Sequence, residues 1–316
     1  GYLLTTGVAN VFLGAYANGN NGGNVLTGNN NIGIGFKACY NLEGDAVNNV
    51  LIGSLSGQNM TTGDDNTAVG NGSAPALTTG ARNVAIGSAS LQSEDTYGYN
   101  TAVGYYALGS LNANANGYNT AVGYSSGSGI TTGIQNTSLG ASTVFDVDAN
   151  NQTTIGFGAT TDSANDIAIG NTSVDEIKGQ VDFSTFSDKR IKTDIKDGDL
   201  GLDFINELKV RKFKKVNPAK YPDEIRKEND GKDETGNEFE WTDAQANKVW
   251  DDLIAQEVKA ALAKHNITDF GGHAEEESSG IQGVAQSMFI YPLIKSVQEL
   301  STKLDAALAR IATLEG

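Results

Sequence analysis

NVAIGSASL, residues 83–91, and NTAVGYYAL, residues 100–108, are two copies of one short pattern. Each copy opens with Asn, a β-branched residue, a small residue, an aliphatic residue and Gly. The pattern occurs ten times, at intervals of 14 to 21 residues, with minor departures. A short repeated period is the signature of a repeat architecture. The ten copies reach their glycines at Gly14, Gly35, Gly53, Gly70, Gly87, Gly104, Gly123, Gly140, Gly156 and Gly170.

Two positions of the pattern are aliphatic or β-branched, namely the residues one and three before each Gly, such as Ile86 and Val84. Residues two apart on a strand share a face, and the residue between them, here Ala85, points to the other face. Each copy therefore predicts a very short β-strand.

The positions around the Gly indicate how the chain returns. The third residue after every Gly is Ala, Ser or Thr, as at Ala107, which indicates a close approach by another backbone or another chain. Gly suits a turn that needs positive φ. Each copy thus predicts a strand, a turn, a second strand and a return loop, which is one coil of a β-solenoid. The Asn four residues before the Gly, such as Asn100 and Asn119, would stack into an amide ladder.

One coil of this kind cannot be stable alone. It would bury about two aliphatic side chains and one small one, which is too little to offset the conformational entropy lost by some 17 ordered residues. Stacked coils share backbone hydrogen bonds, but their core stays thin. We therefore expect an oligomer in which neighbouring chains supply a second buried face.

The 316 residues fall into two parts of different composition. Residues 1–180 hold 30 of the 39 glycines and carry a charge of −9, whereas residues 181–316 hold 19 of the 22 Lys and Arg and carry −7. A total charge of −16 argues against nucleic-acid binding. No apolar run approaches the roughly 18 to 20 residues of a membrane span. We expect a soluble fragment of a longer chain, with no nucleic-acid partner and no membrane insertion.

Few residues of the repeat half suit a metal or a covalent intermediate. The single cysteine, Cys39, excludes an intramolecular disulfide and is expected to be a small packed side chain. The Gly-x-Ser-x-Gly stretch at residues 123–127 lies inside a repeat, and no histidine precedes His265, so no hydrolase site is expected there. No calcium-binding period is present, and we expect solvated loop acids at Asp64, Asp65, Asp146 and Asp148. We predict no metal and no cofactor.

The copies at residues 83–91 and 100–108 resemble the head repeats of trimeric autotransporter adhesins, and similar repeats in phage tail fibres. The resemblance covers roughly residues 8–174. It implies a trimeric, left-handed parallel β-roll.

The second half changes in character. Residues 181–186 alternate like a strand, residues 202–208 have the pattern of an amphipathic helix, and residues 214–245 are a charged stretch expected to be exposed. Beyond Pro292 the apolar residues are spaced 3, 4, 3, 4, 3, which predicts a short coiled coil over about 293–315. The seam consists of Val297, Leu300, Leu304, Ala307, Ile311 and Leu314.

Three stretches, SDKRIK at 187–192, IAQEV at 254–258 and YPLIKSVQEL at 291–300, resemble the intramolecular chaperone domain of phage tail spikes and fibres, the S74 peptidases. The resemblance implies an α+β domain that trimerises, templates the upstream fibre and then cuts itself off. In that family a serine and a lysine five residues later form the catalytic dyad, and these match Ser187 and Lys192.

The chemistry of the residues is consistent with that role. A serine hydroxyl needs a base, and a lysine can serve only if desolvation or nearby cations lower its pKa. Arg190 and Lys189 are nearby cations, and Asp188 could orient the serine. Attack on the Phe186 carbonyl would cut before Ser187, and otherwise the bond from Ser187 to Asp188 breaks. His265 and His273 do not match an auxiliary position and are left out of the site.

The sequence therefore predicts a homotrimeric tail fibre of a virion, assembled in the host cytoplasm, with a receptor on the host-cell surface. We expect a solenoid shaft over 1–174, a connecting strand over 175–186, and a chaperone and self-cleaving domain over 187–316 that is released after folding. The alternative is a surface adhesin with a trimerisation domain that does not cleave. A polysaccharide depolymerase would need residues upstream, because no paired carboxylates are evident here.

Overall fold

The computed structural model describes residues 7–19, 25–174, 176–178, 180, 187–225, 241–275 and 280–315. The chain packs as two compact units, the first of which ends at Val174. Within the described part of the chain, no helix is both long and apolar enough to cross a membrane.

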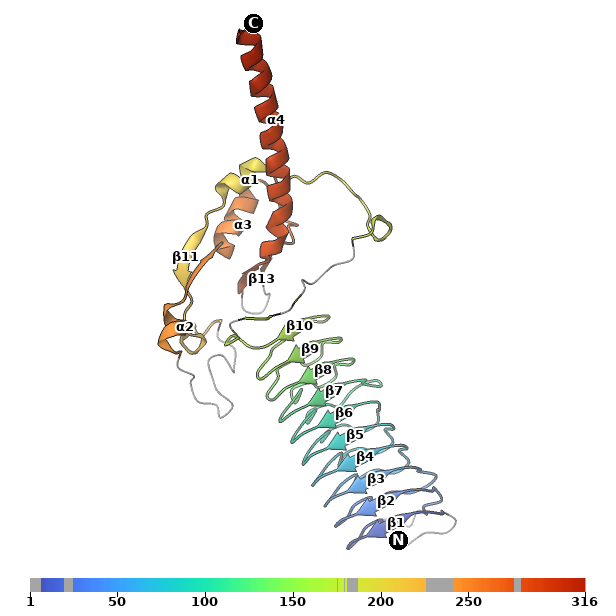
Figure 1. Cartoon of the computed structure of the whole chain (residues 1–316). Coiled ribbons are helices and arrows are strands. Elements are labelled where there is room, and N and C mark those ends of the chain that lie inside the picture. Colours follow the sequence, from blue (N-terminus) through green and yellow to red (C-terminus); the bar gives the residue numbers. More distant parts are fainter. Residues whose placement is uncertain are drawn as a thin grey trace. The chain divides into compact units, whose positions relative to one another are not determined.

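The first unit is a parallel β-solenoid of ten three-residue strands, each hydrogen-bonded to the next in chain order (Figure 1). All ten strands lie where the repeats predict them. They are β1 (Val11–Leu13), β2 (Ile32–Ile34), β3 (Val50–Ile52), β4 (Thr67–Val69), β5 (Val84–Ile86), β6 (Thr101–Val103), β7 (Thr120–Val122), β8 (Thr137–Leu139), β9 (Thr153–Ile155) and β10 (Ile167–Ile169).

The strands pair in register, so equivalent positions of the repeat stack on one another; Ala85, for example, lies opposite Ala102. These middle residues point into the coil and are buried in β2 to β9, while those of the first and last strands are partly buried. The aliphatic columns on either side face outward, and Ile86 is 40% exposed. A coil does bury about two aliphatic side chains and a small one, but in the coil of β6 the aliphatic ones are Leu108 and Leu111, from the turn and loop, and not the outward columns of the strand.

The predicted second strand of each coil is absent from the described residues, which form turns after each Gly. The cause is a run of left-handed residues: Tyr106 has φ 54° and Leu108 has φ 48°. With this backbone the amide of Tyr106 donates to the carbonyl oxygen of Ser88 in one neighbouring coil. The amide of Leu108 donates to the carbonyl oxygen of Ser126 in the other neighbouring coil. The coils stay hydrogen-bonded without extended backbone.

The predicted amide ladder is present. Asn100 Oδ1 accepts from the backbone nitrogen of Asn119 at 3.2 Å and from its Nδ2, also at 3.2 Å. Asn119 Nδ2 also donates to the carbonyl oxygen of Gly133 at 3.0 Å. Because both asparagines are buried, these bonds satisfy groups that water cannot reach.

The second unit contains short helices, two antiparallel strand pairs and one long helix. Phe204, Val258, Leu262 and Phe289 form its core. The helix expected over 202–208 is confirmed as α1, and the expected exposed stretch contains η2 and α2; the expected strand at 181–186 lies outside the described residues. The elements are η1 (Lys189–Ile191), α1 (Leu202–Glu207), β11 (Arg211–Lys214), η2 (Pro218–Lys220), α2 (Asp243–Asn247), β12 (Val249–Asp252), α3 (Ala255–Lys264), β13 (His273–Glu275), β14 (Gln282–Val284), η3 (Gln286–Phe289) and α4 (Ile290–Glu315).

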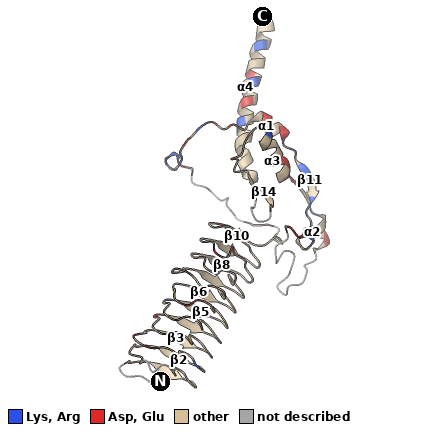
Figure 2. Cartoon of the chain, turned by 180° about the vertical axis from the view of Figure 1, so that it is seen from behind, with Lys and Arg blue, Asp and Glu red and all other residues tan. Residues whose placement is uncertain are grey.

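Helix α4 carries the predicted heptad seam, and acidic and basic side chains alternate along it (Figure 2). The large apolar side chains of its seam are exposed in the single chain, including Val297, Leu300, Leu304, Ile311 and Leu314.

Candidate active site

Ser187 and Lys192 lie on either side of one turn of 3₁₀ helix, η1. The turn closes the five-residue separation, so that Lys192 Nζ donates to Ser187 Oγ at 2.7 Å. The backbone amides of Ile191 and Lys192 donate to the carbonyl oxygens of Asp188 and Lys189. A nucleophile and a candidate base are thus in hydrogen-bond contact within six consecutive residues.

The turn is held by an ion pair inside it. Asp188 Oδ1 accepts from the backbone nitrogen of Arg190 at 2.8 Å, and Asp188 Oδ2 accepts from Arg190 Nη2 at 2.6 Å. The side-chain bond to Arg190 lowers the pKa of Asp188, and the same bond raises the pKa of the guanidinium. In the structure both carboxylate oxygens of Asp188 bind Arg190, so the pair fixes the turn that brings Lys192 to Ser187.

All four of these residues are exposed in the single chain, and the Arg190 side chain is 88% exposed. A lysine acts as a general base only when desolvation or neighbouring cations favour its neutral form. In the single chain the serine and lysine are therefore in hydrogen-bond contact, but they are exposed to water. Phe186 lies outside the described residues.

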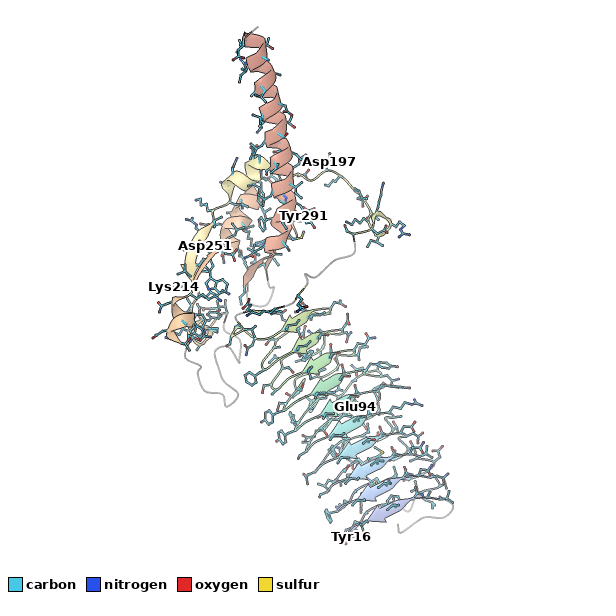
Figure 3. The ribbon with its side chains drawn as sticks, viewed as in Figure 1. Tyr16, Glu94, Asp197, Lys214, Asp251 and Tyr291 are labelled. Carbon is cyan, nitrogen blue, oxygen red and sulfur yellow. The ribbon has the colours of Figure 1, made fainter. Side chains whose placement is uncertain are left out.

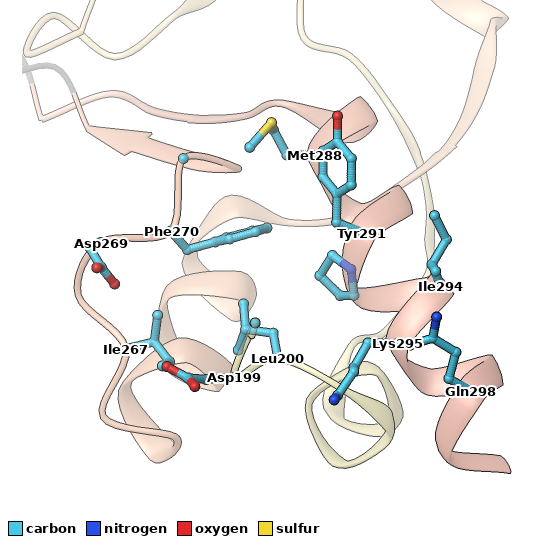
Figure 4. Close-up of a pocket in the computed structure, with 13 residues that line it drawn as sticks. Asp199, Leu200, Ile267, Asp269, Phe270, Met288, Tyr291, Ile294, Lys295 and Gln298 are labelled. Carbon is cyan, nitrogen blue, oxygen red and sulfur yellow. The ribbon is translucent and has the colours of Figure 1, made fainter. Parts of the chain in front are cut away.

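Two cavities flank the start of α4 in the second unit. One, of about 430 Å³, is lined by Leu200, Phe270, Met288 and Tyr291, with Lys295 at its edge (Figure 4). The other, of about 350 Å³, lies between α1, β12 and Leu293. Neither is lined by Ser187 or Lys192, so both are apolar recesses separate from the serine–lysine pair.

The other candidates of the sequence have structural roles. Burial raises the pKa of the Cys39 thiol, which fits the predicted packed side chain. Asp64 Oδ1 accepts from the amide of Val47 at 2.8 Å, and Asp148 Oδ1 accepts from the hydroxyl of Thr131 at 2.7 Å. The described residues contain no group of three or more side chains suited to hold a metal ion.

The two histidines have other partners within the second unit. His265 packs edge-on against Phe204 in the core of the second unit, with ring centroids 5.9 Å apart. His273 contacts Gln282 across the β13–β14 pair at 3.2 Å.

Comparison with known proteins gives no relative: no family model, no curated protein and no solved structure matches the chain. Two features escaped the sequence analysis. One is the Asp188–Arg190 pair, for which opposite charges two residues apart beside a serine were the available signal. The other is a buried glutamate, Glu94, at an aliphatic position of the repeat.

Proposed function

We propose that the chain is part of a phage tail fibre or tail spike, in which the residues from 187 onward drive trimerisation and folding of the solenoid and then release themselves by cleavage at Ser187. The observation that carries the proposal is the 2.7 Å hydrogen bond from Lys192 Nζ to Ser187 Oγ. The same serine and lysine match the motif of the S74 peptidases, and the landmarks at 254–258 and 291–300 follow in the family's order.

In the chemical step, neutral Lys192 takes the hydroxyl proton of Ser187 as Oγ attacks a carbonyl carbon. If that carbonyl belongs to Phe186, the tetrahedral intermediate collapses by breaking the Phe186–Ser187 amide bond, and the Lys192 ammonium returns the proton to the departing nitrogen. Water then hydrolyses the resulting ester, giving a carboxylate at Phe186 and a free amine at Ser187. Alternatively the bond from Ser187 to Asp188 breaks: a water that gives its proton to neutral Lys192 attacks the Ser187 carbonyl carbon, and the amide nitrogen of Asp188 leaves with the returned proton, giving a carboxylate at Ser187 and a free amine at Asp188.

Trimerisation is supported by two exposed apolar surfaces. The outward columns of the strands expose residues such as Leu139, at 51%, and Ile155, at 39%. The seam of α4 exposes Leu300 and Leu304 along one helix face. Rows of exposed apolar side chains favour contact with another chain, and identical parallel repeats supply the matching surface in a second and third copy.

The exposure of Ser187 and Lys192 in the single chain supports a link between cleavage and assembly. Contact with neighbouring chains would remove water from the pair and favour neutral Lys192. Cleavage would then follow trimer formation, and the domain would leave only after the coils are in register. Such a device suits a fold of many similar coils, which is prone to misregistration.

The proposal is tested by expressing the chain beside Ser187→Ala and Lys192→Ala, followed by mass spectrometry and sedimentation. Fragments that end at or next to Ser187 in the parent, with both variants intact and trimeric, support it. The fragment masses also identify which bond is cut.

A surface adhesin with a trimerisation domain that does not cleave is the second candidate. Its support is the water exposure of the pair, together with the adhesin-like repeats. An intact trimeric parent chain favours this candidate.

A further inference from the structure

Glu94 occupies a position that is otherwise aliphatic. The seventh residue after the Gly points into the solenoid in six successive coils, and all six side chains are buried. Glu94 is one of them, 0% exposed, and is labelled in Figure 3. The six are Leu42, Met60, Leu77, Glu94, Leu111 and Ile130.

The carboxylate joins two coils at a break in their backbone ladder. Thr61 donates to Thr78, Thr78 to Asp95, and Asn112 to Thr131, so this edge of the coils is hydrogen-bonded from coil to coil. Among the described residues, the step from Asp95 to Asn112 has no such backbone bond. The break falls where the spacing changes from 17 residues to 19, between Gly104 and Gly123.

At this break Glu94 Oε2 accepts from the amide of Ala113, in the next coil, at 3.1 Å. Glu94 Oε1 accepts from the amide of Tyr97, in its own loop, at 3.0 Å. The carboxyl group thus replaces the missing backbone contact.

Among the residues that the structure describes, no cationic side chain bonds to this carboxylate. The loops packed around it, residues 71–82, 88–99 and 105–118, contain only two other charged side chains. Arg82 pairs with Asp65 and Tyr99 on the outer surface, and Asp95 accepts from the Thr78 hydroxyl. The other titratable groups in these loops are the phenols of Tyr97, Tyr99, Tyr105, Tyr106 and Tyr118.

We infer that Glu94 is a pH-responsive clasp between the coils that begin at β5 and β6, and that the solenoid loses stability as this carboxyl group ionises. Burial raises the pKa of Glu94, and its hydrogen bonds to the backbone amides of Ala113, Tyr97, Asp95 and Thr96 oppose the rise without cancelling it. The folded chain therefore holds the proton more tightly than the unfolded chain. The contribution of Glu94 to stability is greatest below the unfolded-state pKa of about 4.3 and falls as pH rises through the folded-state value. The inference depends neither on cleavage nor on trimer formation.

The test is thermal unfolding of the full chain from about pH 4 to pH 8, in a Ser187→Ala background that blocks any cleavage. Relative to Glu94→Gln, the unfolding midpoint of the Glu94 chain should fall by roughly 2–4 °C or more as pH rises. Asp95→Asn, at the neighbouring half-buried carboxylate, is the matched control and should follow the Glu94 chain.

The inference would be overturned if the unfolding midpoint changed with pH in the same way in the Glu94 chain and in Glu94→Gln. It would also be overturned if Asp95→Asn lost the pH dependence of the midpoint. Should Glu94→Gln fail to fold, Glu94→Leu restores the residue type of the column and replaces it. An infrared band of a protonated carboxyl at a pH where exposed carboxylates are ionised, lost in Glu94→Leu, supports the clasp independently. Absence of that band at every pH above about 5 contradicts it.

Discussion

Lys192 Nζ contacts Ser187 Oγ at 2.7 Å across a turn that is closed by hydrogen bonds among its own residues. The single chain therefore already holds the geometry of a serine–lysine pair, while its surroundings are water. What assembly would have to add is desolvation of the pair. The geometry of the turn and the solvent exposure of Lys192 are therefore two separate properties. Substitutions can change each of them without the other.

The first prediction concerns the turn. Arg190→Gln removes the ion pair with Asp188 but leaves Ser187 and Lys192 in place. Because small misplacements of reacting groups are costly, we expect cleavage to slow by about 10- to 100-fold. The rate is followed by gel densitometry after assembly. Arg190→Lys, which cannot form the forked contact, should also be slow, and a rate equal to that of the parent in both variants would contradict the positioning role.

The second prediction concerns the amide ladder. Asn100→Ala removes an acceptor used twice by Asn119 and leaves buried polar groups unpaired. We expect a loss of about 1–3 kcal/mol in the free energy of unfolding, measured by denaturant titration. Asn59→Ala, which breaks an exposed amide pair with Asn41, is the control and should change stability by no more than about 0.5 kcal/mol. If both substitutions lowered the free energy of unfolding equally, burial of the ladder would not account for its contribution to stability.

The third prediction concerns the glycine of the repeat. Gly87 has φ 133°, and a Cβ added there would lie 2.3 Å from the carbonyl oxygen of Gly104 in the next coil. Gly87→Ala should destabilise the solenoid by about 1–3 kcal/mol or prevent its folding. Gly129→Ala, where no atom lies within 4 Å of the added Cβ, should be tolerated. Circular dichroism melting curves compare the two, and a neutral effect at Gly87 is the opposing result.

The fourth prediction concerns assembly. Leu139, on the outward column of β8, is 51% exposed in the single chain, and a lysine there would be desolvated if a second chain covers it. Leu139→Lys should shift the sedimentation profile from trimer toward monomer. Gln92→Lys, on an exposed loop of the same solenoid, should sediment like the parent. A Leu139→Lys chain that remains fully trimeric argues against this face as the interface.

Much of the solenoid was predictable, because its strands and ladder depend on a period that the sequence repeats ten times. The turns were not, since residues such as Tyr106 and Leu108 adopt left-handed backbone despite side chains that do not favour it; stacking of neighbouring coils imposes that conformation. The repeat left open which face of the strand points inward, and in the structure Ala85 is buried whereas Ile86 is 40% exposed.

For the candidate site, the sequence indicated Ser187 and Lys192 but left the roles of Asp188 and Arg190 open. Their side chains bind each other, a pairing that needs coordinates because either could have faced Ser187. Glu94 was missed although its column lies at a fixed offset, seven residues after the repeat Gly, where five of six successive coils carry an aliphatic residue or Met; that its side chain is buried needed the structure.

The central claim is that Ser187 and Lys192 cleave the chain after it assembles. The most direct test is a time course of the full chain during refolding, with intact mass spectrometry and native sedimentation on the same samples. The account predicts that trimer appears first, that fragments cut at Ser187 follow, and that Ser187→Ala and Lys192→Ala stop at the intact trimer. Cleavage at Ser187 that persists in Lys192→Ala, or a parent chain that assembles fully and stays intact, would contradict it.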